Sequence, residues 1–121
     1  MIFEINPKMP IYVQIISYIK RKIISGEIKG GDRMPSVREY AGEFKVNPNT
    51  IQRVYAELEG ENLIYTQRGI GKFVTENEDT INKLRKDMFN ETIDKFIKDS
   101  KELGFLKEEI LSIIDNRFEV I

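Results

Sequence analysis

The segment NPNTIQRVYAELEGEN, residues 47–62, carries the pattern that decides the fold. Asn47 is a favourable N-cap residue and Pro48 suits the first helical turn, so a helix should begin there. Apolar residues then recur at helical spacing and form one stripe along this helix. The stripe consists of Ile51, Val54, Tyr55 and Leu58. The sequence therefore predicts an amphipathic helix with a polar face on the opposite side.

Two further helices are predicted before this segment. Ser36 is a favourable N-cap and Glu39, three residues later, completes a capping box, so a short helix should follow. Its apolar positions are Val37, Tyr40, Ala41 and Phe44. An earlier helix spans residues 10–25 and ends at Gly26. Its apolar positions are Tyr12, Ile15, Ile16, Ile19 and Ile23. Between the two helices, EIKGGDRMP contains paired glycines and a proline, which predict an irregular loop.

The pattern changes after Asn62, where the helical period gives way to two short β-prone runs. These are LIYTQ, residues 63–67, and GKFVT, residues 71–75, and the RGIG segment that joins them suits a tight hairpin. Three helices, the last two separated by the turn KVN, followed by a hairpin are typical of a winged helix-turn-helix. We therefore predict a mostly α fold with a small β-hairpin, in which residues 1–76 form the first domain.

A second helical region is predicted in residues 77–121. Apolar residues recur at helical spacing from about Asp79 to a break at Gly104, and again from Leu106 onward. Short helices are marginal in water unless their apolar faces are covered, and a second copy of the chain is the simplest cover. We therefore predict a two-helix dimerisation domain. The residues expected to hold the two copies together are Ile81, Leu84, Met88, Ile93, Phe96, Ile97, Ile110, Ile113 and Ile114.

Composition narrows the possible functions. The chain has 121 residues, of which 40% are apolar and 32% charged, as in folded globular proteins. It has no cysteine and no histidine, which excludes thiolate and imidazole metal ligands and histidine-based catalysis. We expect no enzyme activity, no metal and no cofactor. No run is long and apolar enough for a membrane span, and the first residues do not resemble a signal peptide, so we expect a cytoplasmic protein.

Charge is distributed unevenly along the chain. The net charge is −1, which by itself argues against a nucleic-acid partner, because lysine and arginine supply much of the binding to phosphate. Residues 1–75, however, hold 11 basic and 8 acidic side chains, whereas residues 76–121 hold 8 basic and 12 acidic ones. The first domain is therefore the candidate for DNA binding.

The polar face of the helix in residues 47–62 carries side chains of the types that read DNA bases. Opposite the apolar stripe lie Asn49, Gln52, Arg53 and Ala56. Asparagine and glutamine can form paired hydrogen bonds with adenine in the major groove, and arginine can pair with guanine or bind phosphate. A polar helix face is more often simply solvated. Here its place on the third of three closely spaced helices, just before a basic hairpin, favours DNA.

Residues next to this helix are candidates for contacts with the DNA backbone. Arg33 and Arg38 flank the MPS segment, where a helix begins and its amides can join the guanidinium groups in holding phosphate. Arg68 and Lys72 bracket the hairpin glycines, where small residues allow close approach to sugar and phosphate. The glycines also suit a turn that needs positive φ. The GIGK segment lacks the glycine spacing of a nucleotide-binding loop.

The ordered pattern of residues 10–74 resembles the GntR family of bacterial transcription factors. The resemblance lies in IYVQIISYIKRKIISGEIKGGDRMPSVREYAGEFKVNPNTIQRVYAELEGENLIYTQRGIGKFV. The tail segment KDSKELGFLKEEILSII is similar to the two-helix C-terminal segment of the YtrA subfamily. Together these stretches account for nearly the whole chain.

The resemblance implies a role for individual residues. Arg38 would contact phosphate or base near the operator centre, and the start of the third helix would enter the major groove. Some better-known members have arginine at the positions of Pro48 and Gln52, so their operator sequences do not carry over to this chain. The DNA-binding residues expected on all these grounds are Arg33, Ser36, Arg38, Asn47, Asn49, Thr50, Gln52, Arg53, Arg68 and Gly69.

The expected function is therefore a sequence-specific regulator, a repressor by the subfamily's association with transport operons, that binds a two-fold operator on double-stranded DNA as a homodimer. Two alternatives stay open at this stage. One is a small-molecule-gated repressor with a pocket between the tail helices of two subunits, although about 45 residues are too few for an enclosed pocket in one subunit. The other is a protein-interaction adaptor, which predicts no dependence on Arg38.

Overall fold

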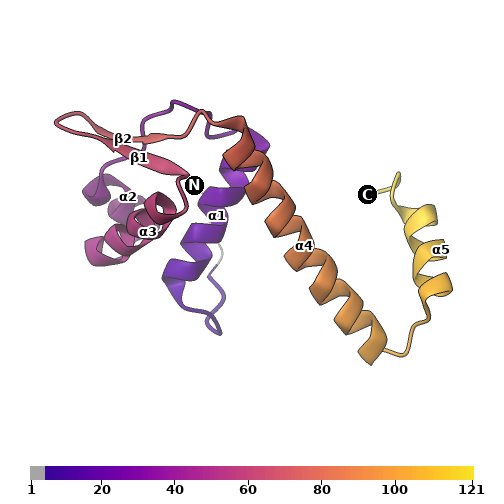
Figure 1. Cartoon of the computed structure of the whole chain (residues 1–121). Coiled ribbons are helices and arrows are strands. Elements are labelled where there is room, and N and C mark those ends of the chain that lie inside the picture. Colours follow the sequence, from indigo (N-terminus) through magenta and orange to yellow (C-terminus); the bar gives the residue numbers. More distant parts are fainter. Residues whose placement is uncertain (1–4) are drawn as a thin grey trace. The chain divides into compact units, whose positions relative to one another are not determined.

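The computed structural model describes residues 5–121, which fall into two compact units, one up to Arg85 and one from Lys86 onward. The elements follow one another along the chain as in Figure 1. They are α1 (Ile11–Ser25), α2 (Val37–Phe44), α3 (Pro48–Gly60), β1 (Ile64–Gln67), β2 (Gly71–Val74), α4 (Glu78–Glu102) and α5 (Lys107–Arg117). This order confirms the predicted winged helix-turn-helix followed by a helical tail, and every predicted helix and strand is present.

The first unit is built around α3, which packs against both α1 and α2. All four residues of the predicted α3 stripe are buried, as are four of the six isoleucines of α1, namely Ile15, Ile16, Ile19 and Ile23. The hairpin adds Leu63, Ile64 and Val74 to the same core. Two of the predicted core positions differ, because Tyr12 and Val37 lie near the first turns of their helices and are only half-buried.

The wing is an antiparallel hairpin in which Thr66 lies opposite Lys72 and Tyr65 opposite Phe73. The preceding loop is more regular than the sequence predicted, because part of it runs along β2. The amide of Gly31 donates to the carbonyl of Val74 at 2.8 Å, and the amide of Met34 donates to the carbonyl of Lys72 at 2.8 Å. Residues 31–34 of the loop therefore form a strip that these hydrogen bonds hold beside β2.

The second unit, from Lys86 onward, consists of the later turns of α4 and the whole of α5. Gly104 adopts φ +84° between the two helices, a conformation that favours glycine. The amide of Leu106 donates to the Glu109 carboxylate at 2.9 Å, which fixes the start of α5. The compact units divide at Arg85, within α4. The functional division predicted after residue 76 stays a prediction. Within residues 5–121, no helix has the length and apolar character required to cross a membrane.

Candidate nucleic-acid interface

The start of α3 is fixed by its own cap. The side chain of Asn47 accepts a hydrogen bond from the amide of Asn49 at 2.8 Å, and Pro48 occupies the first helical turn. The Asn47 carbonyl accepts from the amide of Thr50 at 2.9 Å. Asn47 is therefore a capping residue, and Thr50 is half-buried. The exposed side chains of this first turn point toward solvent, as a helix that enters a groove requires.

The outward face of α3 is exposed as the sequence predicted. Asn49, Gln52, Arg53 and Ala56 are all exposed, opposite the buried stripe. Arg53 also has a defined contact, since its guanidinium carbon lies 3.6 Å from the centre of the Tyr12 ring on α1. The face thus offers two amides and one oriented cation within two helical turns.

Helix α2 packs against α3 and carries Arg38 in its first turn. Ser36 forms a complete capping box, because its hydroxyl accepts from the amide of Glu39 at 3.1 Å while the Glu39 carboxylate accepts from the amide of Ser36 at 3.2 Å. These hydrogen bonds also lower the pKa of Glu39. Ser36 therefore fixes the helix start, and Arg38 is exposed on it.

Arg33 belongs to the strip beside β2, where it pairs with Phe73 through a single β-bridge. Its side chain lies over Gly71, since a Cβ placed on that glycine would be 3.0 Å from the Nε of Arg33. At the hairpin tip Arg68 is exposed and Gly69 has φ +80°, which a residue with a side chain adopts only with strain. Arg33 therefore lies alongside β2, and Arg68 lies at the tip of the hairpin.

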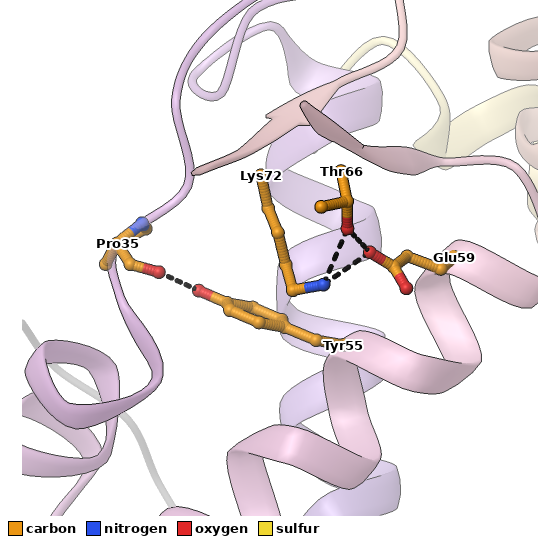
Figure 2. A network of polar contacts seen from close by, with 5 residues as sticks. All are labelled: Pro35, Tyr55, Glu59, Thr66 and Lys72. Carbon is orange, nitrogen blue, oxygen red and sulfur yellow. Dashed lines mark hydrogen bonds and ion pairs between the residues drawn. The ribbon is translucent and has the colours of Figure 1, made fainter. Parts of the chain in front are cut away.

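A polar cluster between α3 and the wing was not found by the sequence analysis. Figure 2 shows the Glu59 carboxylate on α3 accepting hydrogen bonds from Thr66 and from the Lys72 ammonium, which also donates to Thr66 at 2.9 Å. In the same view the hydroxyl of Tyr55 donates to the carbonyl of Pro35 at 2.6 Å. The Thr66–Lys72 pair lies directly across the hairpin, but only packing brings Glu59 to it.

These contacts shift the titration of the groups involved. The hydrogen bonds from Lys72 and Thr66 lower the pKa of Glu59, so this carboxylate is ionised at neutral pH and offsets the charge of Lys72. Burial raises the pKa of Tyr55 and raises that of Tyr40 to about 12, so both hydroxyls stay neutral. Arg68, rather than Lys72, is therefore the better candidate for a phosphate contact from the wing.

The predicted dimerisation residues divide into two groups. Leu84 is only 6% exposed and thus already buried in its own chain, and Ile81 and Met88 are half-buried. From Lys86 onward the apolar residues remain largely uncovered. Ile93 and Ile110 are half-buried, and the exposed ones include Phe96, Ile97, Ile113 and Ile114. Within this second unit, α4 and α5 border a cavity of about 430 Å³ whose walls include Phe96, Ile110 and Ile114.

Comparison with known sequences identifies relatives along most of the chain. The sequence pattern described as "Bacterial regulatory proteins, gntR family" matches residues 11–74. The HTH-type transcriptional regulator YhcF of Bacillus subtilis (strain 168) is 44% identical over 108 residues, which are 89% of this chain and 89% of that protein. The HTH-type transcriptional repressor YtrA of the same strain is 38% identical over 110 residues, 88% of this chain and 85% of that protein.

Solved structures agree with this result. A GntR family transcriptional regulator from Listeria monocytogenes is 42% identical with a TM-score of 0.86, over 93% of this chain and 98% of that chain. The DNA-binding domain of AraR, solved in complex with operator ORX1, is 28% identical with a TM-score of 0.53, over 62% of this chain and 92% of that chain. The protein therefore belongs to the gntR family of bacterial regulatory proteins, as a winged helix-turn-helix transcriptional regulator of the YtrA type.

Proposed function

We propose that this regulator is a repressor that binds a two-fold symmetric DNA operator as a homodimer. The observation that carries the proposal is the exposure of Asn49 and Gln52 on the outer face of α3, whose opposite face is buried in the core. The similarity to the repressor YtrA supports repression, and the AraR complex supports operator DNA as the ligand of this fold. Such a protein acts in the cytoplasm on the bacterial chromosome, and the proposal includes no catalytic step.

Each part of the first unit has a separate task in this proposal. The start of α3 enters the major groove, where Asn49 and Gln52 read bases through their amide groups. Arg38, in the first turn of α2, contacts phosphate or a base edge beside the same groove. Arg33, alongside β2, and Arg68, at the tip of the wing, hold the flanking backbone. Ser36 and Asn47 contribute by fixing the two helix starts, because their side chains are engaged as caps.

The tail supports the assignment of a homodimer. From Lys86 onward no side chain of the described chain is buried, although α4 and α5 carry a full set of apolar residues. A helix of the length of α5 is marginal in water, so its apolar residues need a cover that the chain itself does not provide. A second copy supplies that cover and also presents two α3 helices to a two-fold site.

Selection of fragments from a pool of random DNA tests this function. We expect enrichment of a two-fold sequence whose half-sites are one helical turn apart, about 10–10.5 base pairs, or a multiple of that. Sedimentation of the same preparation should give a dimer at micromolar concentration. Failure to enrich any sequence, or enrichment of a single unpaired half-site by a monomer, would contradict the proposal.

A second candidate, a repressor gated by a small molecule, is favoured by the cavity beside α5. Its volume of about 430 Å³ lies within the range of about 300–1,000 Å³ that is usual for small-molecule sites. An effector that binds there should raise the melting temperature and change operator affinity together. If no compound in a screen of apolar molecules changes both the melting temperature and the operator affinity, the small-molecule candidate is contradicted, and the cavity is assigned to contact with the partner copy.

A further inference from the structure

Tyr12 lies in the first turn of α1, outside the helix-turn-helix, yet it contacts the outer face of α3. The guanidinium carbon of Arg53 lies 3.6 Å from the centre of the Tyr12 ring, close enough for a cation–π interaction. Tyr12 is half-buried, whereas Arg53 is exposed. The ring therefore provides a fixed platform for a side chain that would otherwise sample many rotamers in solvent.

The contact belongs to a longer alignment of the two helices. Lys20 on α1 forms an ion pair with Glu61 just after α3, with Nζ and Oε2 2.9 Å apart. Residues 12 and 20 of one segment therefore meet residues 53 and 61 of the other, so α1 and α3 run in the same direction along this side. This arrangement places the first turn of α1 beside the middle of the outer α3 face.

The first turn of α1 is itself held in place. The side-chain amide of Gln14 accepts a hydrogen bond from the amide of Asn6 at 2.8 Å and donates to the carbonyl of Met9 at 2.9 Å. It also donates to the carbonyl of Asn6 at 2.6 Å. The segment before α1 is thus folded onto the helix start. Tyr12 consequently projects from a turn that is anchored to the segment before it.

We propose that Tyr12 is a positioning residue that holds Arg53 as a clamp on the DNA backbone. This inference rests on the proposed function, since it deepens the description of the same interface. A ring that covers one face of a guanidinium leaves the in-plane N–H donors free to bind phosphate. Because the arginine is already oriented before DNA arrives, less side-chain freedom is given up on binding.

The position of Arg53 indicates a phosphate rather than a base as its target. The N-terminal end of a recognition helix contacts base edges, and Arg53 lies one turn farther along than Asn49. Its guanidinium also lies against Tyr12 of α1, to the side of the α3 face. A charge held at the side of the helix meets the wall of the groove, which is formed by the sugar-phosphate backbone.

The test compares substitutions at both positions on the selected operator and on a set of operator variants. We expect Tyr12→Leu to weaken binding about threefold per subunit, in line with an exposed cation–π pair, and Tyr12→Phe to retain wild-type affinity because the ring remains. Arg53→Ala should weaken binding to all operator variants alike. It should also reduce the slope of log affinity against log salt by about 0.9 for each phosphate that the variant no longer neutralises.

The coupling between the two positions provides the decisive measurement. In the Arg53→Ala background, Tyr12→Leu should cause no further decrease in affinity, because there is no longer a guanidinium to position. Lys22→Ala is the matched control, since Lys22 lies 5.2 Å from the ring of Tyr18 on the same helix but its ammonium pairs with Glu27. We expect this control to leave operator affinity unchanged. Thermal melts of all variants separate these effects from unfolding.

Four outcomes would overturn the inference. Equal operator affinity for Tyr12→Leu and wild type, or additive decreases in the double variant, would show that Tyr12 does not act through Arg53. A weaker discrimination at one base pair in Arg53→Ala would make Arg53 a base reader. If the wild-type protein selects no DNA, the proposed function fails and this inference fails with it, whereas the other three outcomes contradict this inference alone.

Discussion

The unit up to Arg85 and the unit from Lys86 onward both carry apolar residues at helical spacing, but they differ in burial. The first contains every buried residue of the described chain, including the whole α3 stripe, whereas the second contains none. Helical spacing therefore predicts a helix in both cases but does not reveal what covers its apolar face. In the first unit the cover is the chain itself, and in the second we assign it to a partner copy.

If the tail pairs two copies, as proposed, stability and assembly belong to separate parts of the chain. Burial of apolar side chains around Ile51, Val54 and Leu58 stabilises the fold of the first unit. The same core fixes the position of the outer face of α3. The tail helices offer apolar area but no core of their own. We therefore expect substitutions in the first unit to change unfolding, and substitutions in the tail to change association.

The largest expected effect is that of Leu58→Ala. Leu58 is fully buried in α3, so its truncation should lower the free energy of unfolding by about 2–5 kcal/mol, measured by urea denaturation. Leu111→Ala is the matched control, because Leu111 is 51% exposed in α5. At protein concentrations below the dimer dissociation constant, Leu111→Ala should change the free energy of unfolding of the first unit by less than about 0.5 kcal/mol. Equal effects of the two substitutions would abolish the distinction between the units.

The next effect concerns association through the tail. Ile114→Ala should raise the free energy of the dimer, relative to two monomers, by about 1.5–3 kcal/mol, because each copy has less apolar area for a partner to bury. Sedimentation equilibrium measures the change, and Glu108→Ala, an exposed polar position on the same helix, is its control. An unchanged dimer after Ile114→Ala would move the interface away from the cavity beside α5.

A smaller effect should appear on DNA binding without any change in association. Arg38→Ala should weaken operator binding by about 1–3 kcal/mol per subunit, because it removes an exposed guanidinium from the first turn of α2. Titration of labelled operator gives the affinity, and sedimentation should give the same dimer as the wild type. Wild-type affinity in the folded variant would favour the protein-interaction alternative, in which Arg38 has no part.

The sequence was sufficient for the elements whose signals are local. The capping box of Ser36, the N-cap Asn47 and the glycines of the hairpin predicted the starts of α2 and α3 and the turn of the wing almost to the residue. The spacing of apolar residues along a helix also indicates which of its faces is buried, so the exposure of Asn49 and Gln52 on α3 was predictable. Local signals fail where the first turn of a helix extends beyond the core, as at Val37.

The contacts that orient the interface were not predictable, because they join residues far apart in sequence. The spacing of Tyr12 predicts a core position, but the structure places its ring against Arg53. The place of Lys72 in the hairpin predicts a contact with the DNA backbone, yet Glu59 engages it across the space between α3 and β2. Such pairs depend on how helices and hairpin pack, which no periodicity encodes.

The Glu59 cluster provides the smallest predicted effect and tests how firmly the wing is held. Glu59→Gln removes one charge of the pair with Lys72, whose side chains are about one-third exposed, and should lower the free energy of unfolding by about 0.5–1 kcal/mol at neutral pH. Glu61→Gln, which removes the more exposed carboxylate that pairs with Lys20, is the control and should have a smaller effect.

The pH dependence gives this prediction its sign. The pKa of Glu59 is lowered in the folded protein, so the stabilisation is present above the unfolded pKa of about 4.3 and is lost as the pH falls through the folded value. The difference in stability between wild type and Glu59→Gln should therefore shrink on acidification, which melts between pH 7 and pH 3 can measure. A difference that stays constant with pH would assign the effect to packing. Arg68→Ala should reduce the salt dependence of operator binding, because Arg68 is the better candidate for a phosphate contact. If Lys72→Ala reduced it equally, Lys72 would contact phosphate despite its pair with Glu59.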